Sequence, residues 1–498
     1  MWKKRPSKTR RSSIRRSRTE RWKAEMSGTF TIGEKKVRPG VYFRYENNGG
    51  VTTVGATNGV QAVLFQSNWG PLNEEFDMDP TMSNNIADYY GSGKGVKALE
   101  QAFKGGATTI RAVRIGADDG SNASLTLKTS GDSPKEAVKI EAAYPGDRAF
   151  SVSIRTNLIT SQRQCIIYDG GVIFEQFTFE AGDAEPANLV AAMKSSENFN
   201  AVLANASVTG ALADVTQTQM TGGKNPSVTV ESYNKGTDVL ERYKWNVITT
   251  DSDDAAVALL LQSFAQSSYQ NGHLGMACIA GLADQDLTER MTTAASFNDE
   301  KVVYVLSGWQ GSDGVKYEGY LAANRIGGMV AAQETNTSLT HTVIKNAVAL
   351  LEPLTNGEII KAEQKGCLVL ALNDDDQIWI DNAINSLVTP DATQDEGWKK
   401  IRRTKTRFEL MDRLDSTCEK LVGKVNNDTD GRQTIMATGQ KVLNEMIAER
   451  KLMPGATISE DSGHPAEGDS CWFVVNVDDI DSAEHIYLTY EFRYSQIS

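Results

Sequence analysis

The chain has 498 residues, which is too long for one ordinary domain and indicates two to four domains. Hydrophobic residues make up 40% and charged residues 23%, as in ordinary globular proteins, and no apolar run approaches the ~18 residues of a membrane helix. The net charge is −12, but residues 1–25 carry eleven Lys or Arg and two Glu, so the remainder carries −21. This acidic body argues against nucleic acid as the main partner, and no membrane insertion is expected.

Residues 1–25 form a basic leader with almost no hydrophobic content. Such a segment could bind nucleic acid through counterion release. Met26-Ser27-Gly28 resembles a natural start, however, so we interpret the leader as an extension that is disordered or not native. It lacks the apolar region of a signal peptide. The five cysteines are widely spaced without a CxxC pair, which predicts reduced thiols in a protein made in the cytoplasm.

Residues 26–50 are polar and glycine-rich and are interpreted as an N-terminal arm. Within this arm, residues 41–46 alternate between two faces and predict a short strand. Residues 51–117 then form the first piece of a core. Its predicted elements are a buried strand at 60–66, a helix at 83–103 and a strand at 108–115.

From residue 118 to residue 226 the pattern changes to short alternating strands separated by turn residues, which predicts a β-rich domain inserted into the core. Asp169-Gly170-Gly171 indicates a hairpin. Helical content is small, near 186–197. The predicted strands lie at 124–129, 137–142, 150–156, 164–168 and 172–179.

Residues 227–477 alternate strands with long helices, which implies βαβ units and a layered sheet. The predicted strands lie at 245–249, 274–280, 301–306, 367–372, 377–380 and 471–477. The predicted helices lie at 253–270, 284–297, 318–332, 355–364, 398–425 and 430–450.

The helix at 398–425 has a basic first half. Lys399, Arg402, Arg403 and Arg407 share a broad stripe by i, i+3, i+4 spacing. In an acidic protein this stripe could dock an acidic partner, or it could be a solvated helix face. The sequence leaves both interpretations open.

The last stretch, 485–494, alternates strongly and predicts a strand with no nearby partner. Ile486, Leu488, Tyr490 and Phe492 fall on one face. An unpaired strand of this kind is an aggregation hazard unless assembly is its purpose. The strands at both ends of the chain must therefore pair internally or be lent to neighbours.

No motif supports catalysis or a cofactor. The four histidines are not at metal-ligand spacing, and no Gly-x-Gly-x-x-Gly follows a predicted strand. The segment 91–95 resembles a phosphate loop, but Gly95 follows Lys94 where a hydroxyl is needed. The sequence predicts that the protein is not an enzyme and holds neither a metal nor a cofactor.

Two acidic segments are better explained as turns. Residues 426–431 resemble the start of a calcium loop, but the twelfth position is Ala437 instead of a bidentate Glu. We expect a turn between two helices with Asp428 or Thr429 as the N-cap. Residues 374–376 are expected to be a solvated turn, with a weak cation site as the alternative.

Several stretches resemble contractile tail sheath proteins of myophages and R-type bacteriocins, especially those of prophage-like particles from Gram-positive hosts. They are Val-Arg-Pro-Gly-Val-Tyr at 37–42, Ile-Arg-Ala-Val-Arg at 110–114, residues 317–323 before 337–340, Trp-Lys-Lys-Ile-Arg-Arg at 398–403, Gly431-Arg432 and residues 484–492. Their order and spacing span most of 30–495, whereas the basic leader lies outside the family pattern.

This resemblance implies a multidomain α/β (α+β) fold: a discontinuous core at 51–117 and 227–477, a β-rich insertion at 118–226, and strand arms at 26–50 and 478–498. It also implies strand exchange between subunits. The packing faces would be Val41, Phe43 and Tyr45 in one arm and Ile486, Leu488, Tyr490 and Phe492 in the other. Lys399, Arg402, Arg403 and Arg407 would be a candidate contact with an inner tube.

The implied partners are further copies of the chain in stacked rings, a tail tube protein, and baseplate and tail terminator proteins. The implied location is the tail of a virion or bacteriocin particle assembled in the host bacterial cytoplasm. Contraction would need no nucleotide. A sheath component of a related injection machine, such as a type VI secretion system, is one alternative. An α/β enzyme is another, for which only Asp251 and Asp284 stand near strand ends.

Overall fold

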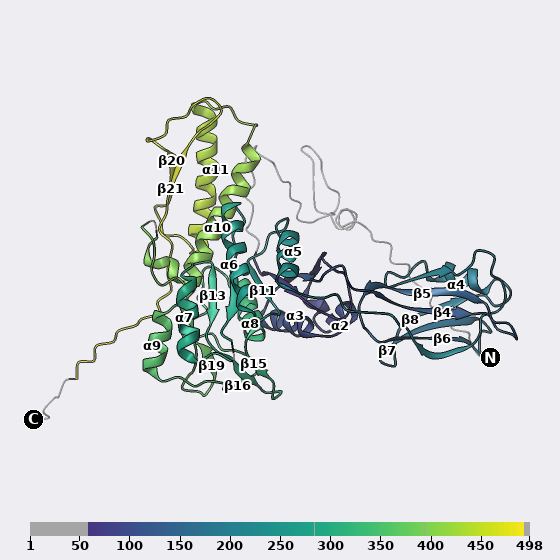
Figure 1. The fold of residues 1–498 in the computed structure, drawn as a ribbon. Coiled ribbons are helices and arrows are strands. Elements are labelled where there is room, and N and C mark those ends of the chain that lie inside the picture. The colour runs from purple at the N-terminus through teal and green to yellow at the C-terminus, as the bar shows by residue number, and fades with distance from the viewer. Residues whose placement is uncertain (1–57, 283, 393, 493–498) are drawn as a thin grey trace, which may run out of the picture. The chain divides into compact units, whose positions relative to one another are not determined.

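A computed structural model describes residues 58–282, 284–392 and 394–492. The predicted strand at 41–46, with Val41, Phe43 and Tyr45, lies outside the described residues. The predicted mixed α/β architecture with several sheets is confirmed (Figure 1).

A seven-stranded sheet forms the centre of the core. Its strands, in sheet order, are β17 (Cys367–Leu368), β13 (Val302–Val305), β12 (Met276–Ala280), β11 (Val247–Thr250), β1 (Val60–Phe65), β3 (Thr109–Arg114) and β2 (Glu75–Met78). Neighbouring strands are parallel except β2, which pairs antiparallel with β3. Because β1 lies between β3 and β11, the two predicted core pieces share one sheet.

Helices cover both faces of this sheet. One face packs against α5 (Val230–Leu240), α6 (Ala255–Gln270), α7 (Leu287–Phe297) and α9 (Asn356–Gln364). The other packs against α2 (Ile86–Tyr90), α3 (Lys94–Gly105) and α8 (Tyr320–Ala332). Successive strand residues point to opposite faces, so Val247 joins the α8 side and Ile248 the α6 side. Burial on both faces explains the continuous apolar runs of these strands.

Helices α3 and α8 touch through glycines. A Cβ added to Gly328 would lie 2.3 Å from the carbonyl oxygen of Ala102, and one added to Gly105 would lie 2.3 Å from that of Arg325. The two backbones are therefore too close for side chains between them. This contact joins a helix of the first core piece to a helix of the second.

The segment predicted to be β-rich contains two antiparallel sheets. One has the order β10 (Val215–Gln219), β6 (Phe150–Thr156), β7 (Arg163–Asp169) and β8 (Val172–Phe179), and the other has β4 (Asn122–Lys128), β5 (Glu136–Pro145) and β9 (Phe199–Leu203). Helix α4 (Glu185–Met193) packs with them. The predicted hairpin joins β7 to β8, with Gly170 and Gly171 at φ 55° and 92°.

The chain enters and leaves this segment at one place, where the amide of Ala117 donates to the carbonyl oxygen of Ser227 at 2.9 Å. Trp69, from the loop after β1, is 1% exposed within the core of the segment and contacts the rings of Phe150 and Phe174. The core piece thus contributes a large apolar side chain to the β sheets.

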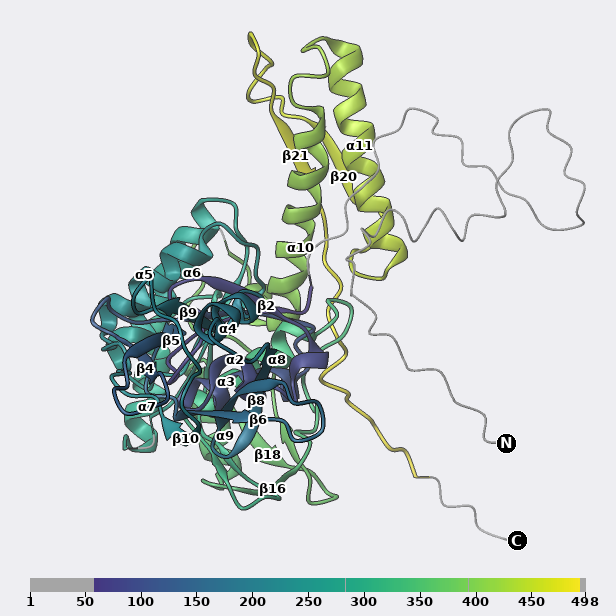
Figure 2. The ribbon, with the colours of Figure 1, turned by 90° about the vertical axis from the view of Figure 1, so that its right-hand side faces the viewer.

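The remaining strands are short. They are β14 (Trp309–Gly311), β15 (Lys316–Tyr317) and β16 (Ala347–Leu350) in one sheet, β18 (Leu370–Leu372) with β19 (Ile378–Ile380), and β20 (Thr457–Glu460) with β21 (Phe473–Asn476). The long helices α10 (Ile401–Cys418) and α11 (Thr429–Ala448) run alongside β20 and β21 (Figure 2). Three 3-10 turns, η1 (Pro80–Met82), η2 (Glu396–Lys399) and η3 (Glu419–Leu421), complete the list.

Two predicted helices differ from the structure. The helix expected at 83–103 is split into α2 and α3, because Gly91 and Gly93 have φ of 65° and 132° and interrupt it. The helix expected at 398–425 begins as η2, and its α-helical part ends at Cys418. The expected helix-to-helix turn is confirmed: Asp428 caps α11 by accepting from the amide of Gly431 at 2.8 Å.

None of the helices in the described residues is both long enough and apolar enough to cross a membrane.

Candidate assembly site on helix α10 and the C-terminal segment

The C-terminal segment exposes a row of large apolar side chains. Ile486, Leu488, Tyr490 and Phe492 are 75%, 69%, 73% and 93% exposed. Residues 485–492 form no strand with any described part of the chain, which differs from the predicted strand. A β-strand needs hydrogen bonds from a partner strand, and here none is supplied. A contiguous exposed apolar row of this kind marks an interaction surface.

Strands β20 and β21 form an isolated two-stranded sheet. Thr457 pairs with Asn476 and Glu460 with Phe473, and within the described ranges neither strand has a partner strand on its outer edge. Two-stranded sheets have little stability alone, and this one packs against α10 and α11 through Ile458 and Val475. An outer strand edge without a partner strand is a place where another strand can add.

A largely apolar groove of about 680 Å³ lies between this sheet and the ends of the two helices. Val422 in its wall is 76% exposed and Met411 is 39% exposed. Its other apolar lining residues include Leu414, Leu421, Ile435, Ile458, Phe473 and Val475. A strand that adds to this sheet would therefore place apolar side chains in the groove and pair its backbone with the sheet edge in the same region.

The predicted basic face on α10 contacts the chain's own acidic C-terminal root, which we define as residues 478–484. Arg403 binds both carboxylate oxygens of Asp479, at 2.8 and 2.6 Å. Arg407 also donates to both, at 3.2 and 3.1 Å. Asp479 therefore lies in a fork of two guanidinium groups, a strong and directional arrangement.

The other two predicted residues differ in their surroundings. Arg402 is only 4% exposed and donates to the carbonyl oxygen of Thr335 at 3.2 Å and to the hydroxyl of Ser482 at 2.9 Å. Lys399 pairs with the exposed carboxylate of Glu396 at 2.7 Å. Three of the four predicted basic side chains thus hold the chain's own C-terminal root. Their contact with a tube stays a prediction.

The sequence pattern did not identify the residues that complete this contact. Lys400 donates to Glu484 at 2.5 Å, and Glu484 also accepts from the hydroxyls of Ser338 and Thr340. The signal that could have found them is charge complementarity. The acidic run 478–484 follows the basic run 399–407 in sequence and has the opposite sign.

The ion pairs shift the acid strength of both carboxylates. Burial alone would raise the pKa of Asp479, but the hydrogen bonds from Arg403 and Arg407 outweigh it and leave that pKa below the usual 3.8. Burial is likewise outweighed at Glu484 by Lys400 and Ser338, so its pKa lies below the usual 4.5. Both groups are therefore ionised and bonded at neutral pH.

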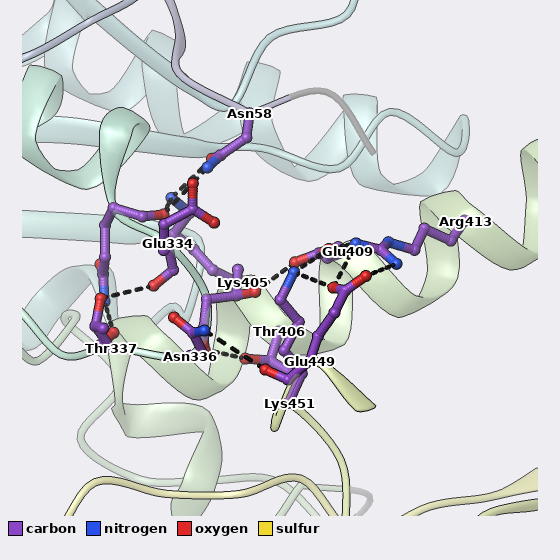
Figure 3. Close-up of polar contacts among 12 residues, drawn as sticks. Asn58, Glu334, Asn336, Thr337, Lys405, Thr406, Glu409, Arg413, Glu449 and Lys451 are labelled. Carbon is purple, nitrogen blue, oxygen red and sulfur yellow. Dashed lines mark hydrogen bonds and ion pairs between the residues drawn. The ribbon is translucent and has the colours of Figure 1, made fainter. Parts of the chain in front are cut away.

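Lys405, on the same helix, contacts the first described residue of the chain (Figure 3). Its ammonium group donates to the carbonyl oxygens of Val330, Ala331 and Gln333 at the end of α8, at 2.5, 3.1 and 2.7 Å, and to the side-chain oxygen of Asn58 at 3.4 Å. Burial lowers the pKa of Lys405 to about 7. A cation at the carboxyl end of a helix satisfies its last carbonyls.

The alternative enzyme residues do not meet in a catalytic arrangement. Asp251, at the end of β11, accepts from the hydroxyl of Tyr233 at 2.6 Å and from the amide of Gln66 at 2.8 Å. Burial raises the pKa of Asp251 to about 6. Asp284 is exposed. Across 58–282, 284–392 and 394–492, no three His, Cys, Asp or Glu residues gather in a way that could hold a metal ion.

Comparison with known proteins gives one family match and several structural relatives. Residues 227–386 match the phage tail sheath protein central domain. Over 492 residues the chain is 21% identical to Bacillus subtilis YqbK, described as an uncharacterized protein; the match covers 94% of this chain and 99% of YqbK.

Among solved structures, the sheath tail protein of Desulfitobacterium hafniense has a TM-score of 0.67 at 18% identity, with 89% of this chain and 100% of that chain covered. The sheath tail protein of Listeria innocua has a TM-score of 0.64 at 18% identity, with 85% and 96% covered. The contracted helical sheath of the anti-feeding prophage has a TM-score of 0.53 at 10% identity, with 92% and 99% covered. These findings confirm the predicted resemblance: residues 227–386 match the phage tail sheath protein central domain, and the described chain has the fold of sheath tail proteins.

Proposed function

We propose that this chain is the repeating subunit of a contractile tail sheath, which polymerises as stacked rings around an inner tube and drives that tube through a bacterial envelope. Its partners are further copies of itself, a tail tube protein, and baseplate and tail terminator proteins. The particle is a phage tail, a bacteriocin or a related injection machine, assembled in the host cytoplasm. The observation that carries the proposal is the exposed apolar row at 486–492 beyond a firmly held root.

Neighbouring subunits are joined by donated strands. Residues 485–492 of one subunit add to an outer edge of the β20–β21 sheet of another, and one face of the donated strand packs into the apolar groove beside it. Backbone pairing supplies affinity, and alternate side chains supply register. The N-terminal strand at 41–46, with Val41, Phe43 and Tyr45, is the second donated strand. Lys399 remains a candidate for the tube surface, together with Arg402, Arg403 and Arg407 in a state where the root has left them.

Contraction draws on energy stored when the sheath assembles in its extended form, and it needs no nucleotide hydrolysis. An assembly held behind a kinetic barrier can release energy once a trigger lowers that barrier. The sequence supports this view, because the loop at 91–95 lacks the hydroxyl residue of a phosphate loop.

The test compares two lysine substitutions on opposite faces of the arm. Leu488 belongs to the apolar row, whereas Thr489 lies on the other face. Burying a leucine contributes roughly 1.5–3 kcal/mol, so Leu488→Lys should raise the critical concentration for polymerisation by about tenfold or more. Thr489→Lys should assemble like the unmodified protein. Sedimentation and electron microscopy of tubular polymers give the readout.

Two results would contradict the proposal. One is an unmodified protein that remains a monodisperse monomer at high concentration. The other is equal polymerisation by the Leu488→Lys and Thr489→Lys variants, which would show that the apolar face of the arm is not buried between subunits.

A further inference from the structure

We propose that the first half of α10 is a junction that holds the roots of both arms, so that part of a pull on either arm is transmitted to this one helix. The C-terminal root is residues 478–484, and the N-terminal root is Asn58 with Gly59, which follow the predicted N-terminal arm. The inference rests on the proposed function in that the arms carry load only in a polymer. The anchoring itself is a property of the single chain.

The C-terminal root is held from two directions. Its side chains bind α10 through the Asp479 fork and the Lys400–Glu484 ion pair. Its backbone pairs with 451–453: the amide of Met453 donates to the carbonyl oxygen of Asp478 at 2.8 Å, and the amide of Ile480 to that of Lys451 at 3.0 Å. Beyond Glu484 the chain makes no strand in the described residues, so tension on the arm arrives at this root.

The N-terminal root is held on another side of the same helix. Lys405 binds Asn58 and the end of α8 together. The amide of Gly59 donates to the carbonyl oxygen of Ala331 at 3.0 Å, and the side-chain amide of Asn58 donates to Gln333 at 3.5 Å. Removing the ammonium would therefore weaken the hold on the end of α8 and on Asn58, and would leave only the two hydrogen bonds between these described segments.

Helical geometry separates the two anchoring faces. At about 100° per residue, Lys405 lies roughly 160° around the axis from both Arg403 and Arg407. The two roots thus contact opposite sides of α10. The backbone hydrogen bonds of the helix run along its axis and connect the turns that carry these contacts. Arg402, between the two faces, binds Thr335 and Ser482 and so contacts both neighbourhoods. Helix α10 therefore links the two roots through side-chain contacts, in addition to the main-chain path from Gly59 into β1.

Hydrogen–deuterium exchange of the unassembled full-length chain tests the anchoring. Asp479→Asn and, separately, Glu484→Gln remove ion pairs of the C-terminal root, and Lys405→Met removes the N-terminal anchor. Glu396→Gln is the control, since it breaks only the exposed pair with Lys399 on the same helical segment. The reporters are the amides of Met453 and Ile480 for one root and of Gly59 for the other.

We expect each anchor variant to speed exchange at its own root by about tenfold or more, corresponding to about 1.4 kcal/mol, and the control to change neither. In tubes, the double variant Asp479→Asn with Lys405→Met should dissociate at lower urea concentration than the Glu396→Gln tubes. Unchanged exchange at both roots, or tubes of the double variant as resistant as the control, would overturn the junction. Absence of tubes from the unmodified chain would instead overturn the proposed function, and the exchange result would still decide the anchoring.

Discussion

At the scale of single residues, the fork around Asp479 predicts how the molecule responds to acid. Its pKa and that of Glu484 are lower in the folded chain than the usual 3.8 and 4.5. The stabilisation from each pair is therefore fully present above these usual values and is lost as the pH falls through the lower folded-state values. We expect the difference in unfolding free energy between the Leu488→Lys chain and the same chain with Asp479→Asn to shrink below about pH 4.

Urea unfolding at a series of pH values between about 3 and 7 measures this difference. The unassembled Leu488→Lys background keeps polymerisation out of the measurement. A difference that stays constant across the series would show that Asp479 is not held in its ionised form by the arginines.

The same residues show what a sequence can and cannot predict at this scale. Spacing alone placed Arg402, Arg403 and Arg407 on one broad side of a helix, because helical periodicity is local. The partner of Arg403 and Arg407 is Asp479, which lies 76 residues after Arg403, and only folding brings them together. The two open interpretations of the stripe, an acidic partner or solvent, did not include the chain's own tail.

At the scale of elements, the contact between α3 and α8 predicts a strict requirement for glycine. A methyl group at Gly328 would meet the backbone oxygen of Ala102 at 2.3 Å, so Gly328→Ala must push the helices apart. We expect this change to lower the free energy of unfolding by about 1–3 kcal/mol, in spite of the better helix propensity of alanine. Thermal and urea unfolding measure the loss.

Gly357 provides the matched control. It also lies in a helix, α9, but a Cβ there meets nothing within 4 Å. Gly357→Ala should raise stability by about 0.4–1 kcal/mol. If both substitutions stabilise the protein, the helices are not in backbone contact.

Long elements were predicted better than short ones, for a physical reason. Helices such as α6, with 16 residues, contain enough residues for a period to show. Strands β11 and β12 were recognised instead as short, continuously apolar runs between predicted helices and turns. By contrast β15 has two residues and β14 has three, too few for any alternation, and α5 was not assigned. The stretch 485–494 has the alternating pattern of a strand, but its residues up to 492 have no partner strand among the described residues, so the predicted strand depends on a partner that the pattern does not identify.

At the scale of the whole molecule, we expect the arm to contribute little to the stability of the single chain. Its large apolar residues at 486–492 are mostly exposed, so the described part of the arm, 485–492, buries little surface. The experiment deletes residues 485–498. We expect the truncated chain to keep its unfolding midpoint within about 1 °C of that of the unassembled Leu488→Lys chain, and to form no tubes. Differential scanning calorimetry measures the unfolding midpoint, and electron microscopy shows whether tubes form. A truncated chain that unfolds would show that the arm is a core strand.

The closeness of Ala117 and Ser227, where the chain enters and leaves the β-rich segment, has a consequence for how such a chain can evolve. Entry and exit of the intervening stretch lie side by side, joined at Ala117 and Ser227 by a backbone hydrogen bond of 2.9 Å, so the length of sequence between them has only a small effect on the entropy of closing the chain there. We therefore expect that evolution can replace this stretch by another domain or by a few linking residues. One contact that resists such an exchange is Trp69, whose indole would become exposed to water and would need a polar replacement in any shortened descendant. Another is the hydrogen bond from Arg148 to the carbonyl oxygen of Asp88 at 3.1 Å.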